Sequence, residues 1–173
     1  MRVADAIFER LKRETDAVFF VPGGGSMFLV DALGRSSIPY VSAIHEQGSG
    51  AMALGYAMAS GKLGVVLVTS GPGATNAITP CLAAWTDSIP VLFLSGQAKT
   101  ETLIGDTGLR TRGVQEADII KMVHPITKLA YQPLTSGYDC TMALEEMITQ
   151  CFDSRRGPCW LSIPLNVQSM SAD

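Results

Sequence analysis

The amino-acid sequence predicts a single α/β domain, built as a doubly wound, mainly parallel sheet with helices on both faces. Segments of helical periodicity alternate with short apolar runs along almost the whole chain, an order that is typical of parallel sheets. The apolar runs are continuous, as in Val65 to Val68, so both faces of each strand should be covered. A length of 173 residues suits one domain with a sizeable core.

The first half of the chain shows helix and strand in regular alternation. Ala4, Ile7 and Leu11 recur at helical spacing, which predicts an amphipathic first helix. The third predicted helix is rich in glycine, alanine and serine. Such a helix suits a close approach, either to its own sheet or to another subunit. The predicted elements are a helix over 3–14, a strand over 17–21, a helix over 27–33, a strand over 40–44, a helix over 47–60 and a strand over 64–69.

The second half continues the alternation but contains one long irregular segment. Residues 98–113 are polar and lack a clear period, and a loop of this length inside a compact domain is usually functional or mobile. The predicted elements are a helix over 74–85, a strand over 90–94, a helix over 114–123, a strand over 127–131, a helix over 138–152 and a strand over 160–163.

Composition excludes several classes of protein. The net charge is −3, from 13 Lys and Arg against 16 Asp and Glu, so a nucleic-acid or anionic-membrane surface is not expected. Only 17% of residues are charged while 47% are hydrophobic, which suggests that a partner covers part of the surface. No apolar run approaches a membrane span, and the N-terminus lacks a signal-peptide core. The four cysteines form no C-x-x-C motif, so a cytoplasmic protein with reduced thiols is expected.

Residues suited to ligand binding follow the ends of four predicted strands. Residues 22–25 read Pro-Gly-Gly-Gly, 45–47 read His-Glu-Gln, 70–76 read Ser-Gly-Pro-Gly-Ala-Thr-Asn, and 95–97 read Ser-Gly-Gln. Ligands of open parallel sheets sit beyond the carboxyl ends of the strands, so these segments should form one rim. Glycines would let a flat ligand approach the backbone, and Glu46 offers it a carboxylate. Taken singly, each segment could also be an ordinary turn or a helix start.

The usual nucleotide and hydrolase motifs do not fit these segments. Gly71 and Gly73 supply two glycines of a dinucleotide fingerprint, but asparagine stands at the third position. Residues 55–62 have the wrong spacing for a P-loop. Ser26 lacks the glycine that a hydrolase nucleophile elbow requires two residues later.

The ordered motifs do resemble a known family, the thiamine diphosphate-dependent enzymes. The similarity is to the N-terminal, pyrimidine-binding domain of the acetolactate synthase large subunit group, and it covers about residues 4–168. The motifs that carry it are Val21-Pro22-Gly23-Gly24, His45-Glu46-Gln47-Gly48, Gly55-Tyr56-Ala57, Thr69 to Asn76, Asp87-Ser88-Ile89-Pro90, Ser95-Gly96-Gln97, Gln115 to Ile119, Pro125 to Lys128 and Gly157 to Pro164.

The resemblance implies a catalytic role for Glu46. The matching glutamate of the family hydrogen-bonds the pyrimidine N1′ of thiamine diphosphate and favours the tautomer whose 4′-nitrogen deprotonates the thiazolium ring. The cofactor then serves as the electron sink for a 2-oxo acid, and the protein supplies placement and electrostatics. The neighbouring His45 could be catalytic or could only orient the glutamate.

The same residue-by-residue comparison assigns roles to further rim residues. It implies that Pro22, Gly23 and Gly24 line the rim near the reacting centre, that Pro72 and Asn76 contact the pyrimidine, and that Gln97 faces the substrate or intermediate as a second catalytic residue. Asn76 and Gln97 also have plain structural readings, as a helix-start hydrogen bonder and a solvated loop residue.

Part of the family pattern is missing from this chain. Family members hold the diphosphate through Mg²⁺ on a separate domain, marked by Gly-Asp-Gly and a later asparagine. Gly105-Asp106-Thr107 is only a partial echo of that motif. The chain is therefore expected to hold the pyrimidine side alone, as an excised domain or as one subunit of a split enzyme. FAD, which some relatives use, would bind outside this chain.

The segment before the Gln115-Glu116 pair also departs from acetolactate synthases. Those enzymes have a compact loop with phenylalanine before the pair, whereas this chain has Gly108 to Gly113 followed by Val114. Relatives that use other 2-oxo acids share the longer form. Arg110 and Arg112 in this loop could pair with a substrate carboxylate or remain solvated.

The resulting prediction is a pyrimidine-binding domain over residues 1–168, with 169–173 beginning a linker or tail. Its function would be that of a thiamine diphosphate-dependent lyase or carboligase on small 2-oxo acids. A homodimer or higher homo-oligomer is expected, in which the diphosphate domain of a partner subunit completes the site. The alternatives are a subunit of a split 2-oxo acid decarboxylase and a non-catalytic α/β binding or regulatory module.

Overall fold

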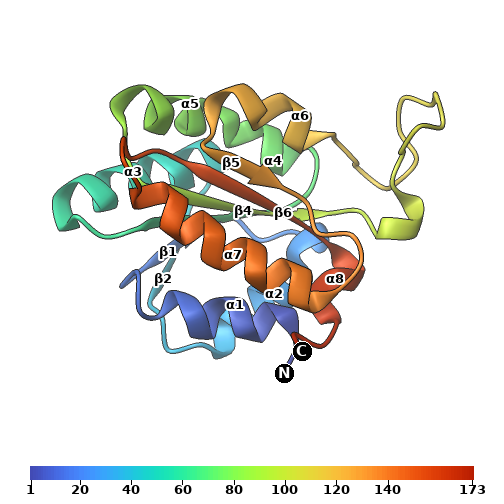
Figure 1. The fold of residues 1–173 in the computed structure, drawn as a ribbon, viewed down its shortest axis with the longest axis horizontal. Helices are drawn as coiled ribbons and strands as arrows, with labels where there is room; N and C mark the ends of the chain where they lie inside the picture. Colours follow the sequence, from blue (N-terminus) through green and yellow to red (C-terminus); the bar gives the residue numbers. More distant parts are fainter.

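A computed structural model describes the whole chain, residues 1–173, and confirms the doubly wound parallel sheet (Figure 1). The six strands lie in the order β2-β1-β3-β4-β6-β5, and every neighbouring pair is parallel. All six correspond to predicted strands. Their bounds are β1 (Val18–Phe20), β2 (Tyr40–Ser42), β3 (Gly64–Val68), β4 (Val91–Gln97), β5 (Leu129–Tyr131) and β6 (Cys159–Pro164).

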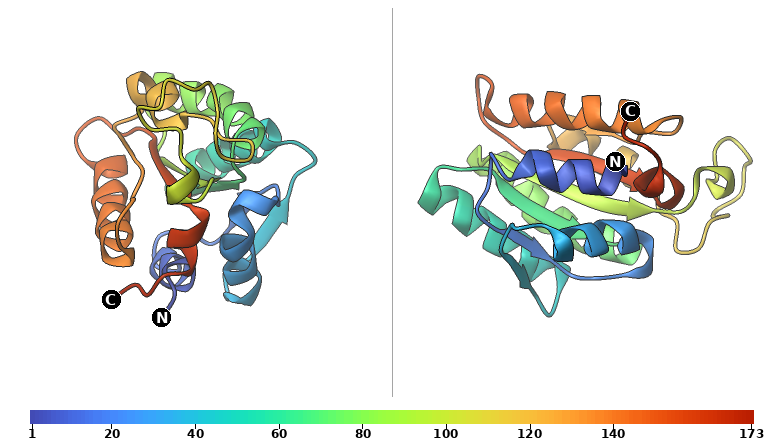
Figure 2. Two further views of the ribbon diagram at one scale, coloured as in Figure 1. Left: turned by 90° about the vertical axis from the view of Figure 1, so that its right-hand side faces the viewer. Right: turned by 90° about the horizontal axis from the view of Figure 1, so that it is seen from below.

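Helices cover both faces of the sheet (Figures 1 and 2). One face carries α1 (Val3–Leu11), α2 (Met27–Arg35), α7 (Gly137–Phe152) and α8 (Leu165–Ser169), and the other carries α3 (Glu46–Ser60), α4 (Pro72–Asn76), α5 (Ile78–Asp87) and α6 (Ile119–Val123). Short 3₁₀ turns occur at η1 (Gly24–Ser26), η2 (Thr100–Thr102) and η3 (His124–Ile126).

Each face of the sheet has its own apolar core, as the continuous apolar strands predict. In β3, Val65 and Leu67 pack under one helical layer while Val66 and Val68 pack under the other. Alternate strand residues therefore serve opposite layers, because successive side chains of a strand point to opposite faces. All four cysteines are free and buried. No helix has the length and apolarity that crossing a membrane requires.

The structure corrects two of the predicted helices and adds one. The helix predicted over 74–85 is two helices, α4 and α5, because the backbone departs from helical geometry at Ala77 (φ −86°, ψ 0°). The helix predicted over 114–123 begins only at Ile119, since Gln115 adopts a positive φ of 51° that no helix allows. The short helix α8 was not predicted. It has only five residues, too few for a periodic pattern to indicate a helix.

The carboxyl ends of the strands meet at one edge of the molecule, as the sequence predicts. Figure 2 (left) shows this edge, with the loop after β4 in front. β1 and β3 are neighbours, yet the chain leaves β1 for α2 on one face and leaves β3 for α4 on the other. This reversal is the topological switch point at which doubly wound sheets bind ligands.

Candidate functional site

The glycine loop after β1 packs directly against the residues that follow β3. The backbone N–H of Gly25 donates to Oγ1 of Thr69 at 3.0 Å. A Cβ at Gly23 would lie 2.4 Å from the Thr69 Cβ, and one at Gly25 would lie 2.5 Å from the Ser70 hydroxyl. Side chains at positions 23 and 25 are therefore excluded by the close approach of the two loops, whereas a Cβ at Gly24 would meet nothing within 4 Å.

Glu46 is the first residue of α3, and its carboxylate reaches across to α4. Nδ2 of Asn76 donates to its Oε2 at 2.9 Å. That is the only protein hydrogen bond to the carboxylate, so Oε1 remains free to accept another. A Cβ at Gly73 would lie 3.2 Å from this Oε1, so glycine keeps the space beside the free oxygen open. Glu46 is half-buried, while Asn76 and Pro72 are exposed.

His45 has a structural task at the start of the same helix. Its Nδ1 accepts a hydrogen bond from the backbone N–H of Gln47 at 3.2 Å, which makes it the N-cap of α3. The cap satisfies one of the free N–H groups of the first turn. The cap lies at the start of the helix that carries Glu46, and both alternatives for His45 stay predictions.

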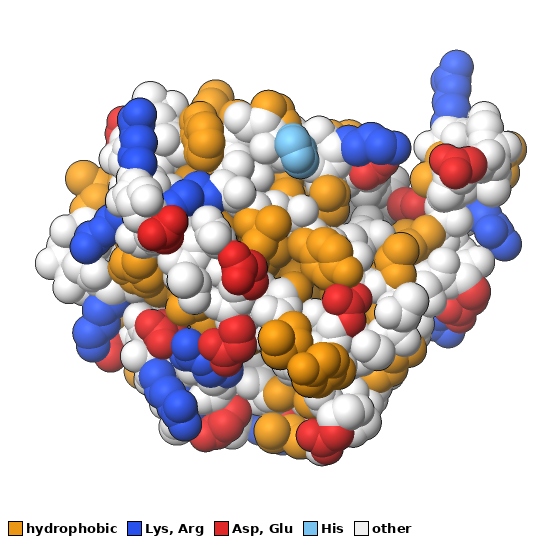
Figure 3. Space-filling view, in the orientation of Figure 1, with side chains coloured by type: hydrophobic (Ala, Val, Ile, Leu, Met, Phe, Trp, Pro, Cys, Tyr) orange, Lys and Arg blue, Asp and Glu red, His pale blue; other side chains and the backbone are white.

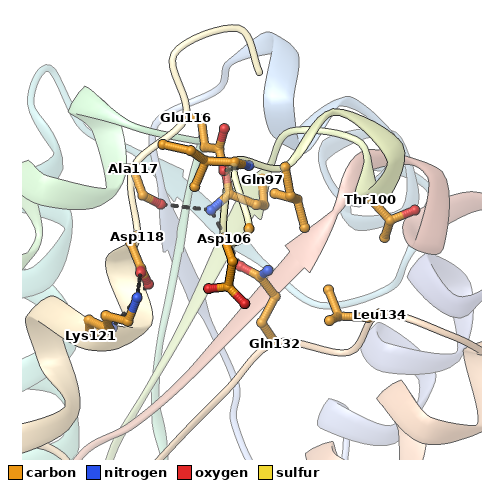
Figure 4. A pocket seen from close by; sticks show the side chains of 12 residues that line it. Gln97, Thr100, Asp106, Glu116, Ala117, Asp118, Lys121, Gln132 and Leu134 are labelled. Carbon is orange, nitrogen blue, oxygen red and sulfur yellow. Dashed lines mark hydrogen bonds and ion pairs between the residues drawn. The ribbon is translucent and has the colours of Figure 1, made fainter. Parts of the chain in front are cut away.

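The prediction that residues 95–97 follow the fourth strand is wrong, because β4 continues to Gln97. Gln97 is 2% exposed, so it is not a solvated loop residue. Its Nε2 donates to the carbonyl of Ala117 at 2.8 Å and to Oε1 of Gln132 at 3.3 Å, and its Oε1 accepts from the N–H of Ala98 at 2.9 Å. Figure 4 shows the amide aimed at the Ala117 carbonyl on one side of a cavity of about 390 Å³. Gln97 therefore joins β4 to the segment before α6, and its assignment toward a substrate stays a prediction.

A second cavity, of about 500 Å³, joins Gln97 to the glycine loop. Gly24, Ser70 and Arg112 line it together with Gln97. Of the two loop arginines, Arg112 therefore lies beside the rim, whereas Arg110 lines a different hollow further out on the loop. Both arginines are exposed, and neither forms an ion pair with a carboxylate.

A second glutamate, Glu116, organises the long loop. Its Oε1 accepts from the N–H of Ile104 at 2.7 Å, and its Oε2 accepts from Gly113 at 2.9 Å and Arg112 at 3.4 Å. The loop over residues 98–118 stands out from the body in Figure 1, and this carboxylate ties its two sides together. The sequence prediction assigned Glu116 no such role.

The structure thus joins the predicted site residues in two ways. Glu46 and Asn76 form one hydrogen-bonded pair beside Gly73, whereas Gly24 lies beside Gln97 at the cavity that they share. Thr69 was not predicted as a site residue, yet it contacts the glycine loop through Gly23 and Gly25. Its place between an apolar strand and a glycine turn is the sequence signal for such a contact.

The family model "Thiamine pyrophosphate enzyme, N-terminal TPP binding domain" matches residues 1–122. The acetolactate synthase large subunit of Corynebacterium glutamicum is 38% identical over 175 residues, covering 100% of this chain and 27% of the relative. The mitochondrial acetolactate synthase catalytic subunit of Saccharomyces cerevisiae is 38% identical over 157 residues, covering 90% of this chain and 22% of the relative.

A third relative gives the same result. The probable acetolactate synthase large subunit of Methanococcus aeolicus is 35% identical over 178 residues, covering 100% of this chain and 28% of the relative. The chain thus spans about a quarter of the length of these relatives. With a family model matched over more than half of its residues, this chain belongs to the thiamine pyrophosphate (thiamine diphosphate) enzymes and corresponds to their N-terminal domain.

Proposed function

We propose that this chain binds and activates the aminopyrimidine of thiamine diphosphate in a lyase or carboligase that acts on 2-oxo acids, as in acetolactate synthesis. One observation carries the proposal. The half-buried Glu46 carboxylate has one oxygen held by Asn76 and one oxygen free, at the switch point of the sheet. A half-buried carboxylate with a free oxygen at this edge can accept a hydrogen bond from a ligand.

The residues around this oxygen fit a flat heterocycle. Gly73 leaves the space beside Oε1 open, and Gly24 has open space where a side chain would stand. Asn76 orients the carboxylate by its hydrogen bond, and the exposed Pro72 offers an apolar surface at the start of α4. Glu46 would hold the proton that it shares with the pyrimidine nitrogen N1′. When bound, the cofactor supplies the electron sink for cleavage next to a carbonyl.

Completion of the site requires a second domain. The diphosphate and its Mg²⁺ would bind to the diphosphate domain of a partner subunit, and any FAD would also bind outside this chain. Apolar side chains exposed next to Glu46 favour such a contact, because Ile44 is fully exposed and Tyr40 and Val41 on the edge strand β2 are about half exposed. Exposed apolar groups of this size mark interaction surfaces. A homodimer or higher homo-oligomer is therefore part of the proposal.

The loop over 108–114 supports one further candidate function. In it, this chain is one subunit of a 2-oxo acid decarboxylase whose domains are split between separate polypeptides. The loop lacks the phenylalanine found at this point in acetolactate synthases, and it places Arg112 at the cavity that Gly24 and Gln97 share. A guanidinium there could pair with the carboxylate of a 2-oxo acid.

A domain exchange tests these possibilities. This chain would replace the matching N-terminal segment of the Corynebacterium glutamicum acetolactate synthase large subunit, which aligns with the whole chain. Formation of acetolactate from pyruvate would support the first proposal, and release of acetaldehyde instead would support the decarboxylase. A folded, oligomeric exchange protein that consumes no pyruvate would contradict both and favour a non-catalytic module.

A second experiment, on the isolated chain, tests whether the diphosphate-binding part of the site lies outside it. Calorimetry with thiamine diphosphate and Mg²⁺ should show weak or no binding, because the groups expected to hold the diphosphate lie outside this chain. Magnesium-dependent binding in the micromolar range would contradict the division of the site between two domains.

A further inference from the structure

A basic cavity lies at the opposite edge of the sheet from the Glu46 site. It is about 530 Å³ in volume and sits where α5 and α7 end and where β5 and β6 begin, at the left in Figure 1. Figure 3 shows Lys and Arg side chains gathered over this end of the molecule. The residues that line it are Trp85, Thr86, Lys128, Asp153, Ser154, Arg155 and Arg156.

The cations of this cavity differ from most others in the chain. Six of the 13 lysines and arginines form ion pairs with carboxylates, and seven do not. Lys128, Arg155 and Arg156 are three of those seven, and they line one cavity. The only carboxylate in its lining is that of Asp153. An excess of positive charge in a concave site, within a chain of net charge −3, attracts anions.

Each cation is held in place by a contact that leaves donors free. Nζ of Lys128 donates to the backbone carbonyl of Asp153, and Nε of Arg155 donates to the Ser88 hydroxyl at 2.7 Å. The guanidinium of Arg156 lies 5.5 Å from the centre of the Phe152 ring. The terminal guanidinium nitrogens of both arginines have no protein partner, so two forked donor groups are available to a ligand.

The backbone around the cavity is arranged to bring these groups together. Gly157 is buried, and a Cβ there would lie 3.1 Å from Cγ of Lys128 and 3.9 Å from the Trp85 ring. Ser154 adopts a positive φ of 47°, a conformation that costs a residue other than glycine about 1–3 kcal/mol. This turn places two consecutive arginines at the mouth of the cavity, beside an indole ring that is 40% exposed.

We propose that this cavity is a second ligand site that takes a phosphorylated small molecule with a flat ring, of nucleoside diphosphate type. Arginine forks and a lysine ammonium suit two phosphoryl groups, and the partly exposed Trp85 in the lining offers an aromatic ring on which the ligand ring can stack. The volume suits a ligand of this size. The site is independent of the Glu46 site, because it lies at the amino ends of the strands.

Tryptophan fluorescence of the 173-residue chain provides the test. The chain has two tryptophans. Trp85 lines the cavity, while Trp160 is fully buried and stacked on Phe93. ADP should quench the emission of Trp85 in a saturable way, more tightly than inorganic pyrophosphate, and more weakly as salt is raised. Calorimetry with Trp85→Phe should then show weaker ADP binding and unchanged pyrophosphate binding.

Variants of the cations decide between a built site and general charge attraction. Arg156→Ala and the double variant Arg155→Ala/Arg156→Ala should each weaken ADP binding at least about tenfold, because charge-assisted hydrogen bonds are lost. Arg156→Ala keeps the hydrogen bond of Arg155 to Ser88. Weaker binding by this variant therefore reports the lost guanidinium and not a disturbed fold. The matched control is Arg13→Ala, which removes an equally unpaired and exposed arginine and should bind ADP unchanged. Equal weakening in the control, or no saturable binding of ADP, would overturn the proposal.

Discussion

Glu46 and Glu116 are both half-buried carboxylates at the carboxyl edge of the same sheet, yet their surroundings differ. Glu116 accepts three backbone hydrogen bonds through both oxygens. Glu46 accepts one, from the Asn76 side chain, and keeps Oε1 free. The comparison teaches that burial alone does not mark a catalytic carboxylate. A saturated carboxylate stabilises the fold, whereas one with a free oxygen at a ligand site can do chemistry.

The sharpest test of this difference replaces Glu46 by glutamine in the domain-exchange enzyme. Glu46→Gln should lower turnover of pyruvate by at least about 100-fold, because the amide cannot hold the shared proton. Stability should change by no more than about 0.5 kcal/mol. Steady-state kinetics and denaturant unfolding give the two measurements.

The matched control for this variant is Glu146→Gln on α7. Glu146 also accepts one side-chain amide hydrogen bond, from Gln150 at 2.8 Å, but it is exposed and outside the rim. Turnover should stay within about twofold of the parent in the control. An active Glu46→Gln enzyme would refute the catalytic assignment.

Replacing Glu116 by glutamine should lower stability, the property that Glu46→Gln leaves almost unchanged. Loss of the charge weakens three backbone hydrogen bonds and should cost about 1–3 kcal/mol of stability or of local opening free energy. Amide hydrogen exchange should accelerate at Ile104 and Gly113, which donate to the carboxylate. Unchanged exchange at both amides would show that the loop is held by other contacts.

Gly73→Ala tests the space beside the free oxygen. The new Cβ would lie 2.6 Å from Cγ2 of Thr69 and 3.2 Å from Oε1 of Glu46, so stability should fall by about 1–3 kcal/mol. Turnover of the exchange enzyme should fall as well. Gly24→Ala is the control, since its Cβ would meet nothing within 4 Å in the chain. The Gly24→Ala variant should have the same denaturant midpoint of unfolding as the parent chain.

The smallest effect is expected from Asn76→Ala. It removes the one hydrogen bond to Glu46, between partly solvated groups, so stability should fall by no more than about 1 kcal/mol. Turnover of the exchange enzyme should fall several-fold, since the carboxylate is then less well oriented. Asn76→Asp places a second carboxylate beside Glu46 and should be the slower of the two. Equal rates for both variants would argue against an orienting role.

Much of the fold could be predicted from the residues alone. Continuous apolar runs such as Val65 to Val68 indicated buried parallel strands, and all six are present. Glycine and polar residues after four strands indicated one rim. The helix break at Ala77 and the late start of α6 could not be predicted. At the start of α6 the sequence could not show that Gln115 packs against Gly71, a residue 44 positions away, where a Cβ would lie 1.9 Å from the Gln115 carbonyl oxygen.

The sequence by itself determined the alternation of strands and helices, the chemical types at the rim and the family, because these depend on local periodicity and on ordered motifs. Only the tertiary structure decided which carboxylate keeps a free oxygen. It also decided which groups hydrogen-bond to the side-chain amide of Gln97. It also decided that Lys128 and Arg155, far apart in the chain, line one cavity. Hydrogen-bond partners and cavities arise where distant segments meet, and no local pattern records that meeting.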